Sequence, residues 1–204
     1  MHPRLLSPGF RQYVRTIHVL DDAGLWADLP AAERSAVIAT LTAPETSYEE
    51  GQVRWPAGGL WHANGEDLGK GDVEEWLAGL VPALAECGVD LRFETIDPCE
   101  LGSPGYAIAM NGRTLDFYRF ETNDQGRSGP ATEDPWMDCS VMPAAEINRL
   151  LAAAGSDRRF ALIWPGCQDG MAVLGPEAVL RAAAPFVEPS LDGYLLVIPE
   201  PSAS

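Results

Sequence analysis

Long apolar segments and lysine are both scarce in this chain. No apolar run approaches the roughly 18 residues that a membrane-spanning helix needs, and the first residues lack the apolar core of a secretory signal. These absences favour a cytoplasmic protein without a membrane partner. Only one lysine accompanies thirteen arginines in a sequence rich in alanine, glycine and proline, which we interpret as the coding bias of a GC-rich bacterium.

Cysteines and histidines are too few and too scattered to indicate a metal centre. The cysteines at positions 87, 99, 139 and 167 include no Cys-x-x-Cys pair, and the histidines at 2, 18 and 62 have no His-x-x-x-His spacing. Lys70 lies between two glycines, but a phosphate-binding loop requires serine or threonine after its lysine, and Gly71 follows here. The sequence therefore predicts neither a metal nor a cofactor.

Basic residues are few against thirty acidic ones, and the formal net charge is −16. Residues 21–138 carry 23 acids and seven basic residues, whereas residues 1–20 carry three arginines and no acid. We expect no nucleic-acid partner, because binding the phosphate backbone requires a basic footprint. An acidic surface speeds encounter with a basic protein partner, although the same surface also serves simply to keep a protein in solution.

The clearest structural signal is the segment 106–120, where two runs of aromatic and branched residues flank Asn111 and Gly112. That pair accepts the positive φ at both central positions of a type I′ turn. A turn at this point sets the pairs Met110 with Arg113, Ala109 with Thr114, Ile108 with Leu115, Ala107 with Asp116, and Tyr106 with Phe117. A slip of one residue would bury Asp116, so we expect this register in the middle of the sheet.

Periodicity predicts the remaining elements and the fold class. We expect helices at residues 8–20, 28–41, 72–87, 143–154 and 175–184, strands at 52–55, 60–63, 89–94, 159–164, 171–174 and 194–198, and a polar loop at 121–138. Pro82 should kink the third helix, and the last strand should be interior. Hairpins outnumber β-α-β crossings, which predicts an α+β fold: a mostly antiparallel sheet with helices packed on one face and a helical N-terminal cap. We expect one domain over residues 1–204, with the cap at 1–44 and the α+β body at 45–204.

Aromatic residues in acidic surroundings indicate where a partner would bind. Trp136 follows an Asp-Pro step in the polar loop, and two further tryptophans lie in glycine-rich, acidic sequence. An aromatic anchor ringed by charge is typical of a binding hot spot, although the same side chains would also close the ends of a sheet. The predicted partner-binding residues are Trp55, Trp61, Glu66, Asp67, Glu133, Asp134, Trp136 and Met137.

His62 offers an alternative, catalytic interpretation. Across a tight turn at residues 64–65 it would face Asp67, which is the arrangement of a general base and the group that orients it. Cys139 or Cys99 would then complete a nucleophilic set. Such triples also arise by chance in a chain of this length, and an edge-strand histidine with a surface partner explains the same pattern.

The leading hypothesis is a non-catalytic bacterial protein that binds a basic protein partner through its acidic surface. Its most concrete forms are an immunity or antitoxin-type inhibitor of a toxin, and a chaperone for a secreted protein; this is an analogy from fold and charge. The first alternative is a small hydrolase or transferase that uses His62 with Asp67. The second is a small-molecule binding module with Trp55, Trp61 and Trp164 around an apolar pocket.

Overall fold

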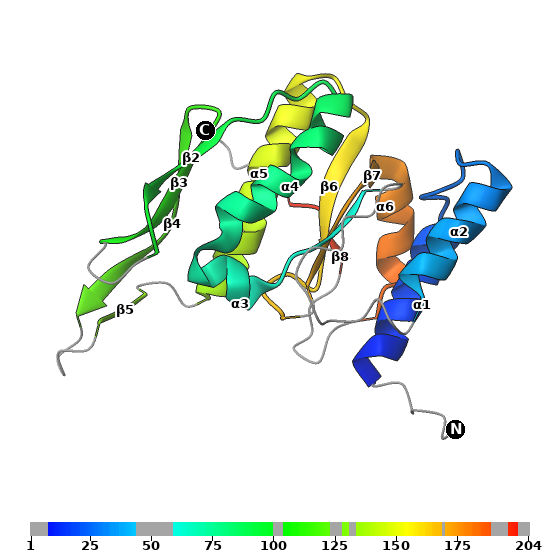
Figure 1. The fold of residues 1–204 in the computed structure, drawn as a ribbon, viewed down its shortest axis with the longest axis horizontal. Coiled ribbons are helices and arrows are strands. Elements are labelled where there is room, and N and C mark those ends of the chain that lie inside the picture. The colour runs from blue at the N-terminus through cyan, green and yellow to red at the C-terminus, as the bar shows by residue number, and fades with distance from the viewer. Residues whose placement is uncertain are drawn as a thin grey trace.

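The computed structural model describes residues 8–43, 59–99, 104–122, 128–130, 134–168, 170–188 and 196–199 (Figure 1). Its helices are α1 (Pro8–Asp22), α2 (Ala31–Leu41), α3 (Gly65–Asp67), α4 (Val73–Glu86), α5 (Pro135–Ala153) and α6 (Glu177–Ala183). A π-helical turn at Leu68–Asp72, called the π turn below, joins α3 to α4, and a 3-10 turn at Ala184–Phe186 follows α6. The strands are β1 (Leu60–His62), β2 (Phe93–Asp97), β3 (Gly105–Met110), β4 (Arg113–Thr122), β5 (Ser128–Pro130), β6 (Arg158–Ile163), β7 (Met171–Pro176) and β8 (Leu196–Val197).

The strands form two antiparallel sheets, and the α+β class with antiparallel pairing is confirmed. Sheet A has the order β1-β7-β6-β8, and sheet B has the order β2-β3-β4-β5. The sequence predicted a single sheet. The strands divide into two sheets because α4 and α5 lie between them and bury an apolar face against each.

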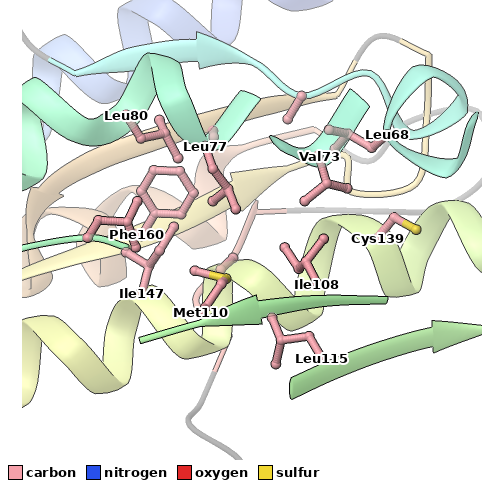
Figure 2. Close-up of a cluster of buried hydrophobic side chains, with 14 of the residues drawn as sticks. Leu68, Val73, Leu77, Leu80, Ile108, Met110, Leu115, Cys139, Ile147 and Phe160 are labelled. Carbon is pink, nitrogen blue, oxygen red and sulfur yellow. The ribbon is translucent and has the colours of Figure 1, made fainter. Parts of the chain in front are cut away.

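Four layers follow one another across the molecule: sheet B, then α4 and α5, then sheet A, then α1, α2 and α6 (Figure 1). The first hydrophobic core fills the space between the two sheets, where Ile108, Leu77 and Phe160 converge from sheet B, α4 and sheet A (Figure 2). The second core lies on the opposite face of sheet A, where Ile17 and Leu180 pack from α1 and α6. Helices therefore cover one face of sheet B and both faces of sheet A.

The alternation of side chains along β6 explains how one sheet serves two cores. Phe160 and Leu162 belong to the first core, whereas Ala161 and Ile163 belong to the second. Successive residues of a strand point to opposite faces, so a strand that is apolar throughout becomes buried on both sides. The predicted helical cap is α1 with α2, which contributes Leu41 to the second core.

The predicted hairpin is β3 with β4, and it lies in the middle of sheet B. Asn111 has a φ of 47° and Gly112 a φ of 82°, as a type I′ turn requires. The first four predicted pairs, from Met110 with Arg113 to Ala107 with Asp116, are observed. The fifth is wrong: Tyr106 lies opposite Tyr118, because a β-bulge adds one residue to β4 at this point.

Helix boundaries show the largest difference from the sequence prediction. The helix expected from residue 143 begins at Pro135, because Asp134 accepts a hydrogen bond from the Met137 backbone N–H (3.0 Å) and proline occupies the first turn. Pro143 lies inside α5, and α4 continues through Pro82 as one helix. The segment 121–138 is thus not one polar loop in the described part of the chain, since β4, β5 and α5 all extend into it.

Three further expectations concern strands and the membrane. β8 pairs with β6 alone among the described residues and ends sheet A, so the prediction of an interior strand is wrong there. The strand predicted at 89–94 starts only at Phe93, and the strand predicted at 52–55 lies outside the described residues. Within the described ranges, every helix is too short or too polar to cross a lipid bilayer.

Candidate functional site

Three segments that are distant in sequence meet at the N-terminal end of α5. They are α3 with the π turn, the turn at 164–168, and the first turn of α5. A methyl group added to Gly65 would lie 2.6 Å from the carbonyl carbon of Gly166, and one added to Gly69 would lie 2.7 Å from the Trp136 ring. Glycine is therefore required for the contact of these segments. We call the exposed and half-buried side chains of this junction the Trp136 surface: Glu66, Asp67, Lys70, Trp136, Met137 and Gln168.

Asn64 and Gly65 begin a helix and do not form the tight turn that the sequence predicted. The Asn64 side-chain oxygen accepts hydrogen bonds from the backbone N–H groups of Glu66 (2.9 Å) and Asp67 (3.3 Å), as an N-cap residue does. The Gly65 N–H donates to the Cys167 carbonyl at 2.9 Å, which ties the start of α3 to the 164–168 turn. The tight-turn geometry that was to place His62 opposite Asp67 is absent.

Two tyrosines of sheet B hold the π turn from the protein interior. The Tyr106 hydroxyl donates to the Gly71 carbonyl at 2.8 Å, and the Tyr118 hydroxyl donates to the Gly69 carbonyl at 2.9 Å. Burial raises the pKa of both hydroxyls, so they remain neutral donors. Gly71 has a φ of 125°, which L residues rarely adopt. The Trp136 surface thus rests on a fixed backbone.

The 164–168 turn contains a strained residue. Trp164 has a φ of 53°, a rare conformation for a bulky side chain, and its buried indole N–H donates to the Glu188 carbonyl at 2.9 Å. Such strain persists only where the surrounding structure fixes it, and it occurs most often at functional sites. The turn presents Gln168 to Glu66.

The charge of the Trp136 surface is negative. One oxygen of Glu66 accepts from the Lys70 ammonium group and the other from the Gln168 side-chain amide. The hydrogen bond from Lys70, followed by that from Gln168, lowers the pKa of Glu66, so this carboxylate stays ionised. At Asp72 desolvation, then the charge of Asp67, raises the pKa. The carboxylates of Glu66, Asp67 and Asp72 all lie close enough to the Lys70 ammonium group for their charges to act on it.

The structure brings together most of the residues that the sequence predicted to bind a partner. Glu66, Asp67 and Trp136 lie on this one surface, with Trp136 38% exposed. Met137 is half-buried against Gly166. Asp134 lies beside them, with its side chain used as the cap of α5.

Trp61 lies elsewhere. The Trp61 ring packs on Phe160, with ring centroids 6.1 Å apart, and Trp76 packs on the same phenylalanine at 5.7 Å. Trp61 therefore borders the first core. Trp55 and Glu133 lie outside the described residues.

The sequence missed Lys70 and Gln168 as members of this surface. Lys70 was detectable, because a lysine four residues after Glu66 on a helix is placed for an ion pair. Gln168 follows Glu66 by 102 residues, and no local pattern indicates a contact over that separation.

The catalytic interpretation gains no support from the position of Cys139. Its side chain is fully buried in the first core (Figure 2), and burial raises the pKa of the thiol. A reactive cysteine needs the opposite, a lowered pKa and access to solvent. His62 lies on β1 opposite Met171. Among the described residues, no group of three or more His, Cys, Asp and Glu side chains is placed to hold a metal ion.

The small-molecule interpretation placed Trp61 and Trp164 around one pocket, but they belong to different cores on opposite faces of sheet A. An open hollow of about 700 Å³ lies instead between α1 and α2. The Arg34 guanidinium that lines it is paired with Asp21 at 2.6 Å, so the hollow presents little uncompensated charge. No protein-family model, curated protein or solved structure matches this chain.

Proposed function

We propose that the protein is a non-catalytic bacterial protein that binds a basic protein partner through the Trp136 surface. The observation that carries this proposal is the exposed Trp136 ring, which lies against Gly69 of the π turn, in the segment that directly follows the acidic residues Glu66 and Asp67. Tryptophan is among the residues most enriched in the hot spots of protein interfaces, which lie near the centre of the interface.

The rigidity of the surface supports the same function. Lys70 and Gln168 fix the Glu66 side chain, and Tyr106 and Tyr118 fix the π turn beneath it. A surface that is already ordered loses little conformational entropy when a partner binds. The net charge of −16 adds long-range attraction for a basic partner, which raises the association rate at low salt.

Two kinds of protein have this combination of acidic surface and binding without catalysis. One is an immunity or antitoxin-type inhibitor, which covers the basic surface of a toxin. The other is a secretion chaperone, which holds a secreted protein before export. Both predict a basic partner and no metal or cofactor requirement.

We expect Asp67→Lys and Trp136→Ala to abolish capture of the basic partner by the immobilised chain. Asp67→Lys places a cation where the partner brings one, and Trp136→Ala removes the apolar anchor, at a cost of about 2 kcal/mol or more in binding free energy. Capture from a lysate of the source cells, followed by mass spectrometry and by association rates at two salt concentrations, measures both effects.

Two control variants at other positions test whether the effects are specific to the Trp136 surface. The alternative is a general effect of a charge reversal or of the loss of an exposed aromatic ring. Glu86→Lys makes the same charge change at the exposed end of α4, and Phe186→Ala removes an exposed aromatic ring near α6. Both should retain the captured protein. Equal losses in all four variants would contradict a site at the Trp136 surface.

The alternative, a small hydrolase or transferase that uses His62 with Asp67, makes a different prediction. On the binding proposal, His62→Ala captures the partner with unchanged affinity, because His62 lies on β1 outside the Trp136 surface. Hydrolysis of ester or phosphate-ester substrates by the wild-type chain, lost in a folded His62→Ala variant, would support the enzyme instead.

A further inference from the structure

The hollow between α1 and α2 has the size of a ligand-binding site. The two helices lie side by side in the layer farthest from sheet B (Figure 1), and the hollow has a volume of about 700 Å³. Ligand pockets measure roughly 300–1,000 Å³, so a small molecule fits here. Its polar lining comes from His18 and Asp21 on α1, and from Arg34 and Ser35 on α2.

The rest of the lining is aliphatic. Leu29 and Ile38 are half-buried, and the alanines at positions 27, 31 and 39 are exposed. The short alanine side chains leave the space between the helices open, and the two larger side chains offer methyl and methylene groups for contact. A ligand that fits this wall has C–H groups on one side.

The charges of the hollow cancel. Asp21 and Arg34 are the charged residues of its lining, and Arg34 donates from Nε to the Asp21 carboxylate at 2.6 Å and from Nη2 to the Asp21 carbonyl at 3.4 Å. An anion would therefore meet the Asp21 carboxylate, and a cation would meet the Arg34 guanidinium. Electrostatic complementarity favours a ligand without net charge.

The hollow still offers hydrogen bonds of both kinds. Among the described residues, the second carboxylate oxygen of Asp21 and the Nη1 group of Arg34 have no hydrogen-bond partner, and neither do His18 and Ser35. A purely apolar ligand would take water from these groups and return nothing, which costs free energy. A hydroxyl group both donates and accepts, so it satisfies the carboxylate and the guanidinium alike.

We propose that this hollow binds a small neutral compound with several hydroxyl groups, the class of monosaccharides and polyols. Its hydroxyl groups bind Asp21, Arg34, His18 and Ser35, and its C–H groups contact the aliphatic wall. The site is separate from the Trp136 surface, because α1 and α2 cover the face of sheet A opposite the one that α4 and α5 cover (Figure 1).

Titration of the ¹⁵N-labelled full chain with D-glucose and with myo-inositol tests this site. We expect saturable amide shifts at the end of α1 and along α2, with a Kd of about 1–10 mM, because the hollow is open and few hydrogen bonds replace those to water. D-Glucuronate has the glucose ring with a carboxylate and should bind more weakly, since its charge meets Asp21. The proposal is overturned if neither neutral probe saturates up to about 100 mM, or if glucuronate binds as tightly as they do.

Variants assign the binding to the hollow. Ala39→Phe should abolish the shifts, because the ring fills the space from an exposed position of α2. Ala36→Phe adds the same ring at an exposed position of α2 outside the lining and should bind as the wild type does. Unchanged binding in Ala39→Phe, or equal losses in both variants, would contradict a site between α1 and α2.

Asp21→Asn tests the role of charge. The new amide oxygen still accepts from Arg34 Nε, but the negative charge beside the guanidinium is gone. Glucuronate should therefore gain about fivefold or more in affinity relative to the neutral probe. The same order of affinities in this variant as in the wild type would mean that Asp21 does not select against anions, contrary to the proposal.

Discussion

Gly65→Ala is expected to destabilise the protein by roughly 3 kcal/mol and to displace the Trp136 surface. The new methyl group would lie 2.6–2.7 Å from the carbonyl carbon, Cα and carbonyl oxygen of Gly166, all backbone atoms that no side-chain rotation can move. The two segments must separate, which stretches the hydrogen bond from Gly65 N–H to the Cys167 carbonyl. Urea unfolding measures the loss, and the Trp136 indole N–H resonance reports the displacement.

Gly79→Ala provides the matched control for this change. Gly79 lies within α4, and a methyl group there meets no atom within 4 Å. Alanine in a helix interior is favoured over glycine by about 0.5–1 kcal/mol, so this variant should be more stable than the wild type. A Gly65→Ala variant as stable as the wild type would show that the start of α3 and the 164–168 turn can separate without a loss of unfolding free energy.

Asn148→Ala is expected to cost roughly 4 kcal/mol of unfolding free energy. The buried Asn148 amide accepts from the Phe160 N–H (2.7 Å) and donates to the Phe160 carbonyl (2.8 Å) and the Pro199 carbonyl (2.9 Å). The Asn148 side chain thus pairs with the backbone of Phe160 as a neighbouring strand would. β8 pairs only with Leu162 and Ile163 of β6 and does not extend to Phe160. Alanine leaves these backbone groups buried and unpaired.

Urea denaturation with an unchanged m-value measures this loss. Gln168→Ala is the control, because it removes an exposed amide that makes a hydrogen bond at the surface, and it should change the unfolding free energy by about 0.5 kcal/mol or less. Equal effects of the two substitutions would mean that the Asn148 hydrogen bonds are replaced by water after the mutation.

Part of the Trp136 surface was predictable, because acidic and aromatic residues that are close in sequence mark it. Glu66 is adjacent to Asp67, and Trp136 is adjacent to Met137. We predicted both pairs as partner-binding residues from the composition of the local sequence alone. The close approach of the segments that carry these pairs was not predictable. It depends on Gly69 and Gly166, whose role is the absence of a side chain, and a single glycine gives no signal of which segment approaches it.

The sequence by itself determined the features that depend only on residues close together in the chain. Asn111 and Gly112 set the turn and four of the hairpin's pairs, because their backbone preferences act over two residues and the alternation of side chains penalises a slip. The tertiary structure alone decided the division into two sheets, the bulge opposite Tyr106, and the placing of Arg113 and Arg149 on Glu146. These features depend on which apolar faces pack together, and that choice is settled by burial across the whole chain, beyond the reach of any local pattern.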